Sequence, residues 1–334
     1  MSFEPIIGLE VHVQLNTRTK MFCSCSSEYL DVEPNTYVCN VCLGLPGSLP
    51  SVNYEAVISA IKLGLSLNCK ISELTKFDRK NYVYPDLMKG YQISQLDLPI
   101  AVEGEIKVKN NINENSKIRI NRVHMEEDVA KLIHDEISGE VLVDLNRSGM
   151  PLLEVVTEPD FRSSVEAENY LTNLQSIVRF LSIGNANMEE GSFRCDANVS
   201  IRKKGSEELN EKVEIKNMNR IKAVSRAIEY EIQRQINEVE SGNRIIQETR
   251  GWDDINNKSI PQRSKEDAHD YRYFPEPDLP AIKLSKDVIQ NISKNLPELP
   301  EKKFERYVKE IGISEYDAKI IISNKNKTIF FEDV

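Results

Sequence analysis

The sequence predicts an α+β fold with a largely antiparallel sheet. Over roughly the first 290 residues, short stretches with alternating apolar residues interleave with a few amphipathic helices, without a strict strand–helix repeat. After Asn291 the strand patterns end and only short helical stretches remain. A chain of 334 residues is long enough for two domains, and we place them at residues 1–292 and 293–334.

Helices and strands of the first part follow from the spacing of apolar residues. Each expected helix has apolar residues three or four positions apart, and the last of them ends at a Ser–Gly pair that suits a helix terminus. The expected strands are short apolar or alternating stretches. The helices are 53–68, 164–181 and 220–239; the strands are 6–15, 118–123, 141–146, 152–156, 194–202 and 213–218.

The C-terminal part carries short helical stretches at 301–310, 314–323 and 327–332. Pro297 and Pro300 suit a linker followed by a helix start. About 40 residues of helix bury too little apolar surface to fold alone. We therefore expect the sequence to be a truncated form of a longer protein.

Composition limits the class of protein. The chain is 40% hydrophobic and 29% charged, which is typical of a soluble globular protein. Its net charge of −10 argues against a protein that simply coats nucleic acid, although local basic patches remain compatible with RNA. No stretch approaches the roughly 18 apolar residues of a membrane span, and the N-terminus lacks the character of a signal peptide. We expect a cytoplasmic protein without a membrane partner.

One expected strand carries a row of polar side chains. Strict alternation places Arg194, Asp196, Asn198 and Ser200 on one face and Cys195 on the apolar face. Buried polar groups need partners, so this cannot be an ordinary core face. For one strand alone, exposure to solvent explains the pattern equally well.

Two further segments repeat the acidic pattern. Glu10 and His12 project side by side from the N-terminal strand, and HMEED, residues 124–128, follows another strand. Three consecutive carboxylates repel one another unless a cation lies among them. Carboxylates joined by an imidazole suit Mg²⁺ or Mn²⁺. Each segment alone fits a solvated edge, whereas the three together predict a carboxylate-lined metal site.

Four of the six cysteines lie close together in the sequence. Cys23 and Cys25 form one pair, and Cys39 and Cys42 form a second pair with the spacing that presents two thiolates to one ion. This arrangement predicts a structural zinc site; the alternative is a loop of reduced thiols. A site with four thiolate ligands has no open coordination position, so zinc here would hold a loop rather than catalyse.

Basic and aromatic segments offer contacts to a nucleotide or an RNA. Residues 76–95 include Lys80 and Tyr84, and residues 267–280 include Arg272 between two tyrosines. For the first segment a solvated loop is the favoured interpretation. The sequence has no GxxxxGK[ST] loop, so any ATP is not held by a P-loop, and no GxSxG elbow supplies a nucleophile.

Long motifs in one order carry a resemblance to a known family. They are IGLEVHVQL, KMFCSCS, VCNVCLGLPGSLP, KFDRKNYVYPDLMKGYQISQ, HMEEDVAK, DLNRSGMPLLEVVTEPD, MEEGSFRCDANVSIR, QETRGWD and DYRYFPEPDLP. From Phe3 to about Asn324 the chain resembles the B subunits of the aspartyl/glutamyl-tRNA amidotransferases. The resemblance implies a cradle-shaped catalytic domain, a helical domain that is cut short here, and an absent tail domain that helps hold tRNA.

The activity that the resemblance implies is the repair of misacylated tRNA. ATP phosphorylates the side-chain carboxylate of Glu on tRNA(Gln) or of Asp on tRNA(Asn), and ammonia then displaces the phosphate. The implied partners are a glutaminase (amidase) A subunit, which makes the ammonia, and a small C subunit, in a bacterial-type heterotrimer. Bound Mg²⁺ would neutralise charge between the carboxylate and the γ-phosphate.

Site residues carry over from the resemblance position by position. It implies a Mg²⁺ site of Glu10, His12 and Glu127, with Glu126, Asp128 and Asp196 nearby for a second ion or in support of the first. The resemblance also implies that phosphate or nucleotide is contacted by Ser192, Arg194, Asn198 and Tyr84. Lys80 would line the ammonia path or stabilise the acyl phosphate. Cys23, Cys25, Cys39 and Cys42 resemble a zinc site that only some members carry.

Two other interpretations stay open. One is a tRNA-binding scaffold without catalysis, which would tolerate loss of Glu127 or Asp196. The other is the archaeal sibling specific for Glu-tRNA(Gln), which carries an inserted domain. The sequence has no insertion of that size before its C-terminal helices, and this favours the bacterial or organellar form.

Overall fold

A large mixed sheet forms the centre of the molecule. The computed structural model describes residues 3–135, 138–264 and 270–334. Nine strands pair in the order β14-β13-β12-β11-β1-β10-β7-β6-β2, and only the β12–β13 pair is parallel. The strands are β1 (Phe3–Gln14), β2 (Lys70–Ile71), β6 (Ala101–Lys109), β7 (Asn115–Glu127), β10 (Pro151–Thr157), β11 (Phe193–Lys203), β12 (Val213–Lys216), β13 (Glu248–Asp253) and β14 (Lys258–Ser264). The predicted α+β class with a largely antiparallel sheet is confirmed.

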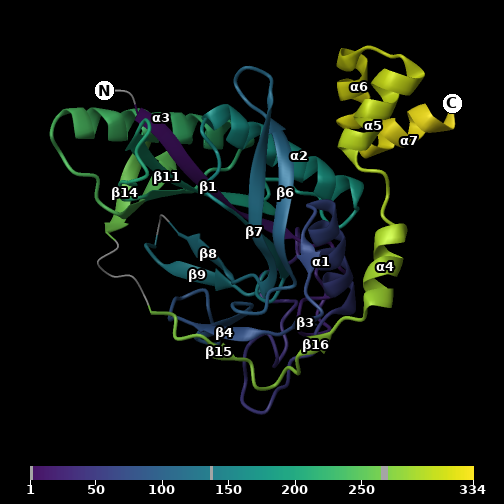
Figure 1. Cartoon of the computed structure of the whole chain (residues 1–334). Helices are drawn as coiled ribbons and strands as arrows, with labels where there is room; N and C mark the ends of the chain where they lie inside the picture. Colours follow the sequence, from purple (N-terminus) through teal and green to yellow (C-terminus); the bar gives the residue numbers. More distant parts are fainter. Residues whose placement is uncertain (1–2, 136–137, 265–269) are drawn as a thin grey trace.

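Smaller sheets flank the large one on its lower side in the view of Figure 1. They are β15–β4–β5 (Phe274–Pro275, Asp78–Asn81, Tyr91–Ser94), β16–β3 (Ile282–Lys283, Leu74–Thr75) and the hairpin β8–β9 (Lys131–His134, Val141–Asp144). Residues 76–95, expected as a solvated loop, therefore contain two paired strands. Of the other basic segment, 267–280, residues 267–269 lie outside the described residues, and its remainder supplies β15.

Three amphipathic helices cover the apolar side of the large sheet. They are α1 (Tyr54–Ser66), α2 (Ser164–Phe180) and α3 (Ile221–Glu240), within two residues of the predicted bounds. The side chains of Asn53 and Ser163 accept hydrogen bonds from the first turns of α1 and α2, as helix N-caps do. Alternation in β1 buries Ile7, Leu9 and Val11 against this layer. Glu10 and His12 must then point to the opposite side of the sheet.

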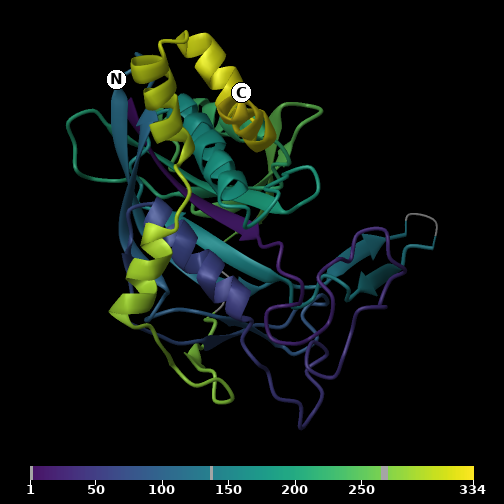
Figure 2. The ribbon, with the colours of Figure 1, turned by 90° about the vertical axis from the view of Figure 1, so that its right-hand side faces the viewer.

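The helices after residue 299 form a group at one corner of the molecule, and the helix before them lies apart from this group (Figures 1 and 2). Helix α4 (Lys286–Lys294) lies beside α1, and α5 (Pro300–Arg306), a π-helical turn (Tyr307–Ile311), α6 (Glu315–Ile322) and α7 (Lys325–Asp333) follow. The predicted boundary at residue 292 falls inside α4, and the two-domain division stays a prediction. Lys325 Nζ donates to the Phe180 carbonyl at the end of α2, which ties α7 to the sheet domain.

None of the described helices is both long and apolar enough to cross a membrane.

Candidate functional site

Strand pairing brings two histidines and a glutamate into one row across the sheet. In the antiparallel register His12 of β1 faces Glu154 of β10, and Glu154 in turn faces His124 of β7. Side chains of directly paired residues project from the same face. Glu126 lies two residues beyond His124 and so shares this face. The row is created by register, because its members are far apart in the sequence.

The side chains of this row converge. His12 Nε2 lies 3.4 Å from Glu126 Oε1 and 3.2 Å from Glu154 Oε2. His124 Nε2 lies 3.6 Å from Glu126 Oε2 and 3.3 Å from Glu154 Oε2. One ligand atom each of His12, Glu126 and Glu154 lies within 4.8 Å of the other two. We name these three residues the histidine–carboxylate cluster.

Burial and mutual charge set the protonation of this cluster. Burial alone would raise the pKa of Glu126, but hydrogen bonds from His12 and His124 hold it well below its usual range. The pKa of Glu154 is likewise held low by the two imidazoles against the effect of burial. Burial opposes the charge on His12, yet the two carboxylates raise its pKa to about 10. A divalent cation would displace the proton of the His12 imidazole that lies between the carboxylates. Two carboxylates with one imidazole are a donor set that Mg²⁺ and Mn²⁺ accept.

A half-buried lysine lies next to the cluster. Lys80 of β4 has its Nζ 4.8 Å from the ring centre of Tyr271 and 5.7 Å from that of Tyr82. Burial lowers the pKa of Lys80, but Glu126, Tyr273 and Glu154, with Tyr271, together raise it above its usual value. Lys80 therefore stays charged and faces the carboxylates. This places the strand pair β4–β5 opposite the polar face of the large sheet.

Polar groups continue along the same face toward β12. Asn198 Nδ2 donates to Glu10 Oε1 at 3.2 Å, and the buried Asn198 Oδ1 has no partner among the described residues. Burial and the nearby carboxylates of Glu154 and Asp196 raise the pKa of Glu10. Asp196 pairs with Lys216 of β12. Glu10 and Asp196 thus lie near the cluster, but Glu10 is not one of the three residues that share a ligand sphere.

The three consecutive acids of HMEED face three different partners. Glu126 joins the cluster, whereas Glu127 points to the other side of β7, where it pairs with Lys89 and accepts from the Ile93 N–H at 3.0 Å. Asp128 accepts from Arg194 Nη1 at 2.9 Å. The strand expected to end at Val123 continues to Glu127, so alternation separates these side chains. The structure does not bring Glu127 together with His12 and Glu10.

Three of the predicted phosphate or nucleotide ligands lie in different surroundings. The Ser192 hydroxyl accepts from the Asn187 N–H at 2.9 Å and also bonds Asn185, so it holds the loop before β11. Tyr84 is exposed in the turn between β4 and β5. Arg194 is half-buried and held by Asp128. Their assignment to phosphate or nucleotide stays a prediction.

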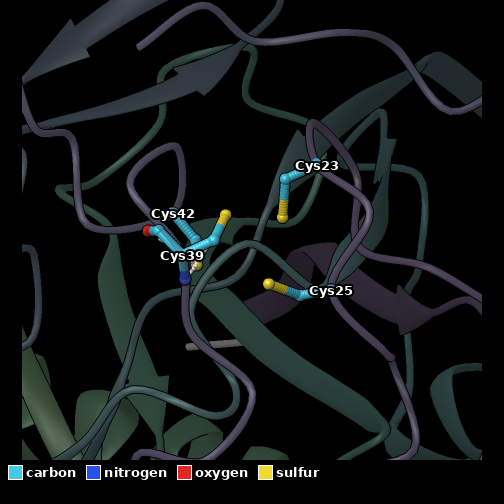
Figure 3. A group of neighbouring side chains, drawn as sticks. All are labelled: Cys23, Cys25, Cys39 and Cys42. Carbon is cyan, nitrogen blue, oxygen red and sulfur yellow. Dashed lines mark hydrogen bonds between the residues drawn. The ribbon is translucent and has the colours of Figure 1, made fainter.

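The four cysteines form a second cluster in the loop between β1 and α1. Their sulfur atoms all lie within 4.8 Å of one another and point toward a common centre (Figure 3). Cys42 Sγ accepts from the Cys39 N–H at 3.0 Å, and the ammonium of fully buried Lys20 lies 3.9 Å away. A hydrogen bond from Cys23, together with Lys20, lowers the pKa of Cys42 to about 5. Four thiols in this arrangement can hold a metal such as zinc.

Sequence reasoning missed Glu154, His124 and Lys216. Glu154 had a readable signal, because it is a lone carboxylate in the apolar strand LLEVV and a buried charge needs a partner. His124 was seen only as the first letter of HMEED. Lys216 had no signal of its own, since its partner Asp196 depends on the pairing of β11 with β12.

The fold and the site together define a class of protein. A mixed α/β domain whose sheet carries a buried histidine–carboxylate cluster beside a charged lysine is a candidate metal-dependent catalytic domain.

Comparison with known proteins then identifies the family. The model of the GatB/GatE catalytic domain matches residues 5–290. The B subunit of the aspartyl/glutamyl-tRNA(Asn/Gln) amidotransferase of Persephonella marina is 54% identical over 332 residues, which cover 99% of this chain and 69% of that protein. Proteins of the same name from Dehalococcoides mccartyi (55% over 337 residues, 99% and 68%) and Thermodesulfovibrio yellowstonii (52% over 333 residues, 100% and 70%) are similar. The chain belongs to this family of amidotransferase B subunits, as the motifs predicted.

Proposed function

We propose that the chain carries the ATP-dependent half of a tRNA amidotransferase. In this proposal a side-chain carboxylate oxygen of Glu on tRNA(Gln), or of Asp on tRNA(Asn), attacks the γ-phosphorus of ATP and ADP leaves. Ammonia then attacks the resulting acyl phosphate and expels inorganic phosphate, which yields Gln-tRNA(Gln) or Asn-tRNA(Asn). The observation that carries the proposal is the convergence of His12, Glu126 and Glu154 on one face of the sheet.

The cluster supplies what the phosphorylation step requires. A carboxylate and a triphosphate repel each other, and bound Mg²⁺ offsets this charge and aligns the two groups. His12, Glu126 and Glu154 would hold that ion, and Glu10 and Asp196 lie close enough to hold a water or a second ion. Lys80 places a fixed positive charge beside the cluster, where it can bind the acyl phosphate.

This assignment modifies the ligand set that the motifs imply. His12 remains in it, Glu10 moves to its edge, and Glu126 with Glu154 replaces Glu127 as the carboxylates nearest to His12. Glu127 is engaged by Lys89 and Asp128 by Arg194. In this proposal Glu127 and Asp128 stabilise the C-terminal end of β7 through these ion pairs. Arg194 can contact a phosphate while it remains paired with Asp128.

Substrate and partners follow from the family. The B-subunit relatives are named for Asp/Glu-tRNA amidation, and we propose that this chain acts on the same class of tRNA in the cytoplasm. Among the described residues, Cys195 is buried on the apolar face and the Ser94 hydroxyl at the cluster donates to Glu126 Oε2 at 3.2 Å, and we assign neither of them to the release of ammonia from glutamine. We therefore assign ammonia production to a glutaminase A subunit, with a small C subunit completing a heterotrimer.

We assign a structural role to zinc at the cysteine cluster. All four thiolates come from one loop, and together they would fill a tetrahedral coordination shell. Such an ion would hold the segment between β1 and α1 in place. It would offer no open position to a substrate.

The test is phosphate transfer from γ-labelled ATP. The chain, combined with the A and C subunits of a close relative, is supplied with ATP, Mg²⁺ and Glu-tRNA(Gln) or Asp-tRNA(Asn), and ADP and amidated tRNA are measured. A second arm uses the chain extended by the C-terminal part of the Persephonella marina relative, because this chain matches 69% of that protein. ADP release that requires the misacylated tRNA is expected. Its absence in both arms would refute the phosphorylation step.

The same assay addresses the scaffold alternative. A scaffold would bind tRNA without needing the cluster, so replacing Glu126 by Gln would leave the activity of the assembled complex unchanged. An enzyme loses its activity with this substitution and retains tRNA binding. Binding is measured by filter retention of the same labelled tRNA.

A further inference from the structure

We propose that His124 is a positioning residue that fixes Glu126 and Glu154 in the orientation that receives the divalent ion. The inference rests on the proposed metal function of the cluster. His124 is buried on β7, and its Nε2 lies 3.6 Å from Glu126 Oε2 and 3.3 Å from Glu154 Oε2. It therefore contacts both carboxylates, as His12 does from β1.

The second ring nitrogen of His124 is occupied by an arginine. Arg122 Nε donates to His124 Nδ1 at 3.3 Å. A guanidinium has only donors, so in this contact Nδ1 is the accepting nitrogen, and Nε2 is the ring nitrogen that lies against the two carboxylates. Arg122 Nη2 also lies 4.0 Å from Glu154 Oε1. Arg122 thus contacts both the ring of His124 and one side of Glu154.

The contacts of both ring nitrogens decide what His124 can do. Arg122 contacts Nδ1, and Nε2 lies against both carboxylates, so the ring is held between Arg122 and the two acids. His12 shares a ligand sphere with Glu126 and Glu154, and His124 is outside that group of three. The two histidines therefore have different tasks: His12 is the ligand and His124 orients the ligands.

Orientation matters because the carboxylates repel each other before the ion arrives. Glu126 and Glu154 come from neighbouring strands and are both buried, so their charges repel each other. His12 contacts both carboxylates, and the Ser94 hydroxyl donates to Glu126 at 3.2 Å. His124 adds a further polar contact, with Nε2 at 3.6 Å from Glu126 and 3.3 Å from Glu154. Residues that hold metal ligands through hydrogen bonds typically contribute about 10- to 100-fold to metal affinity.

The experiment measures Mn²⁺ binding to the unsubstituted chain and to His124→Gln by electron paramagnetic resonance, without ATP or tRNA. We expect the substitution to weaken Mn²⁺ binding about 10- to 100-fold. Nitrogen hyperfine couplings of the bound Mn²⁺ should show one imidazole in the unsubstituted chain, still present in His124→Gln and lost in His12→Gln. The matched control is His134→Gln, which changes an exposed histidine on β8 and should leave affinity unchanged.

A double substitution tests whether Arg122 acts through His124. Arg122→Met removes the donors but keeps most of the length of the side chain, and it should weaken Mn²⁺ binding less than His124→Gln. The double variant should bind no worse than His124→Gln alone, because both changes remove one linked interaction. Additive losses would contradict the linkage between these residues.

The outcomes separate this inference from the proposed function. Unchanged Mn²⁺ affinity in His124→Gln, with the folded state verified by circular dichroism, would overturn the positioning role and leave the metal site intact. Loss of an imidazole coupling in His124→Gln would instead make His124 a ligand and also overturn it. Failure of the unsubstituted chain to bind Mn²⁺ would refute the metal site itself.

Discussion

The described residues of the chain form two clusters of metal-ligand residues, and these are built in opposite ways. The histidine–carboxylate cluster takes one residue each from β1, β7 and β10 of the central sheet. The cysteine cluster takes all its residues from positions 23–42 of one loop. The first cluster depends on strand register, and the second depends on spacing along the chain.

This difference in construction gives the two clusters different chemical roles. The sheet holds His12, Glu126 and Glu154 on a rigid support, leaves room in the coordination shell and places Lys80 beside them. The loop presents four thiols that would surround an ion completely. A site that must meet a substrate benefits from the first arrangement, and a site that holds a loop needs only the second. The two clusters should therefore respond independently to substitution.

The largest expected effect comes from the sheet cluster. Glu154→Gln removes the carboxylate that contacts both histidines and keeps the size of the side chain. We expect phosphate transfer to fall about a thousandfold or more, because metal stabilisation of the transferring group amounts to several kcal/mol. ADP release in the assembled complex is the measurement.

Its control is Glu207→Gln, which changes an exposed carboxylate in the loop between β11 and β12 and should retain full activity. A Glu154→Gln variant with less than tenfold loss would place the ion elsewhere on the sheet. Both the histidine–carboxylate cluster and the cysteine cluster would then have structural roles only.

The next effect concerns the loop cluster and falls on stability. Cys39→Ser should release zinc and lower the melting temperature by several degrees, since an ion that binds only the folded loop stabilises the folded state. Mn²⁺ affinity at the sheet cluster should change less than about twofold, because sites without shared partners act additively. Zinc content by atomic absorption, melting and Mn²⁺ titration are measured on one preparation.

Cys69→Ala provides the matched control, because Cys69 is a buried thiol outside the cluster and its loss should leave the zinc content unchanged. A parallel fall in Mn²⁺ affinity and zinc content in Cys39→Ser would show that the clusters are coupled. The independence inferred from their construction would then be wrong.

The same contrast explains how much the sequence alone revealed. Spacing identified the cysteine cluster, and the structure brings all four sulfurs together. Alternation identified the polar faces of β1 and β11, because period-two patterns need no knowledge of partners. The fold class and the three long helices followed from periodicity in the same way.

The sheet cluster could be predicted only in part. His12 and Glu126 were named, but Glu154 was not, since only the pairing of β10 with both β1 and β7 brings it to them. Glu127 was grouped with His12 because the family resemblance implied it, and HMEED was expected to follow the strand rather than continue it. Once β7 is extended to Glu127, alternation alone separates Glu126 from its neighbour.

A pH experiment sharpens the comparison through His12. Its pKa is raised from 6.5 to about 10 by the two carboxylates, against the effect of burial. A raised pKa stabilises the folded state below the unfolded value, and this contribution is lost as pH rises through the folded value. In Mg²⁺- and Mn²⁺-free buffer, the difference in unfolding free energy between the unsubstituted chain and His12→Gln should therefore shrink from pH 6.5 to 10.

Mn²⁺ affinity should change in the opposite direction over this interval, because the ion needs the unprotonated imidazole. Urea unfolding and Mn²⁺ titration at matched pH values give two slopes against pH, one for the difference in unfolding free energy and one for the Mn²⁺ affinity. The Cys39→Ser variant should keep both, since its loop does not contribute to the sheet cluster. Slopes of the same sign would exclude His12 as the ligand.

The smallest expected effect tests whether a residue at the edge of the sheet cluster belongs to the site or to its support. The Ser192 hydroxyl is engaged by Asn187 and Asn185 in the loop before β11. Ser192→Ala should cost about 1–2 kcal/mol of stability, because it removes the hydrogen bonds to Asn185 and Asn187, and leave the KM for ATP unchanged. A raised KM with unchanged stability would instead make Ser192 the phosphate contact that the family motif implies. Because the substitution removes a single oxygen, melting and ATP titration on one variant decide between the two roles, and the result fixes how far along β11 the catalytic face extends.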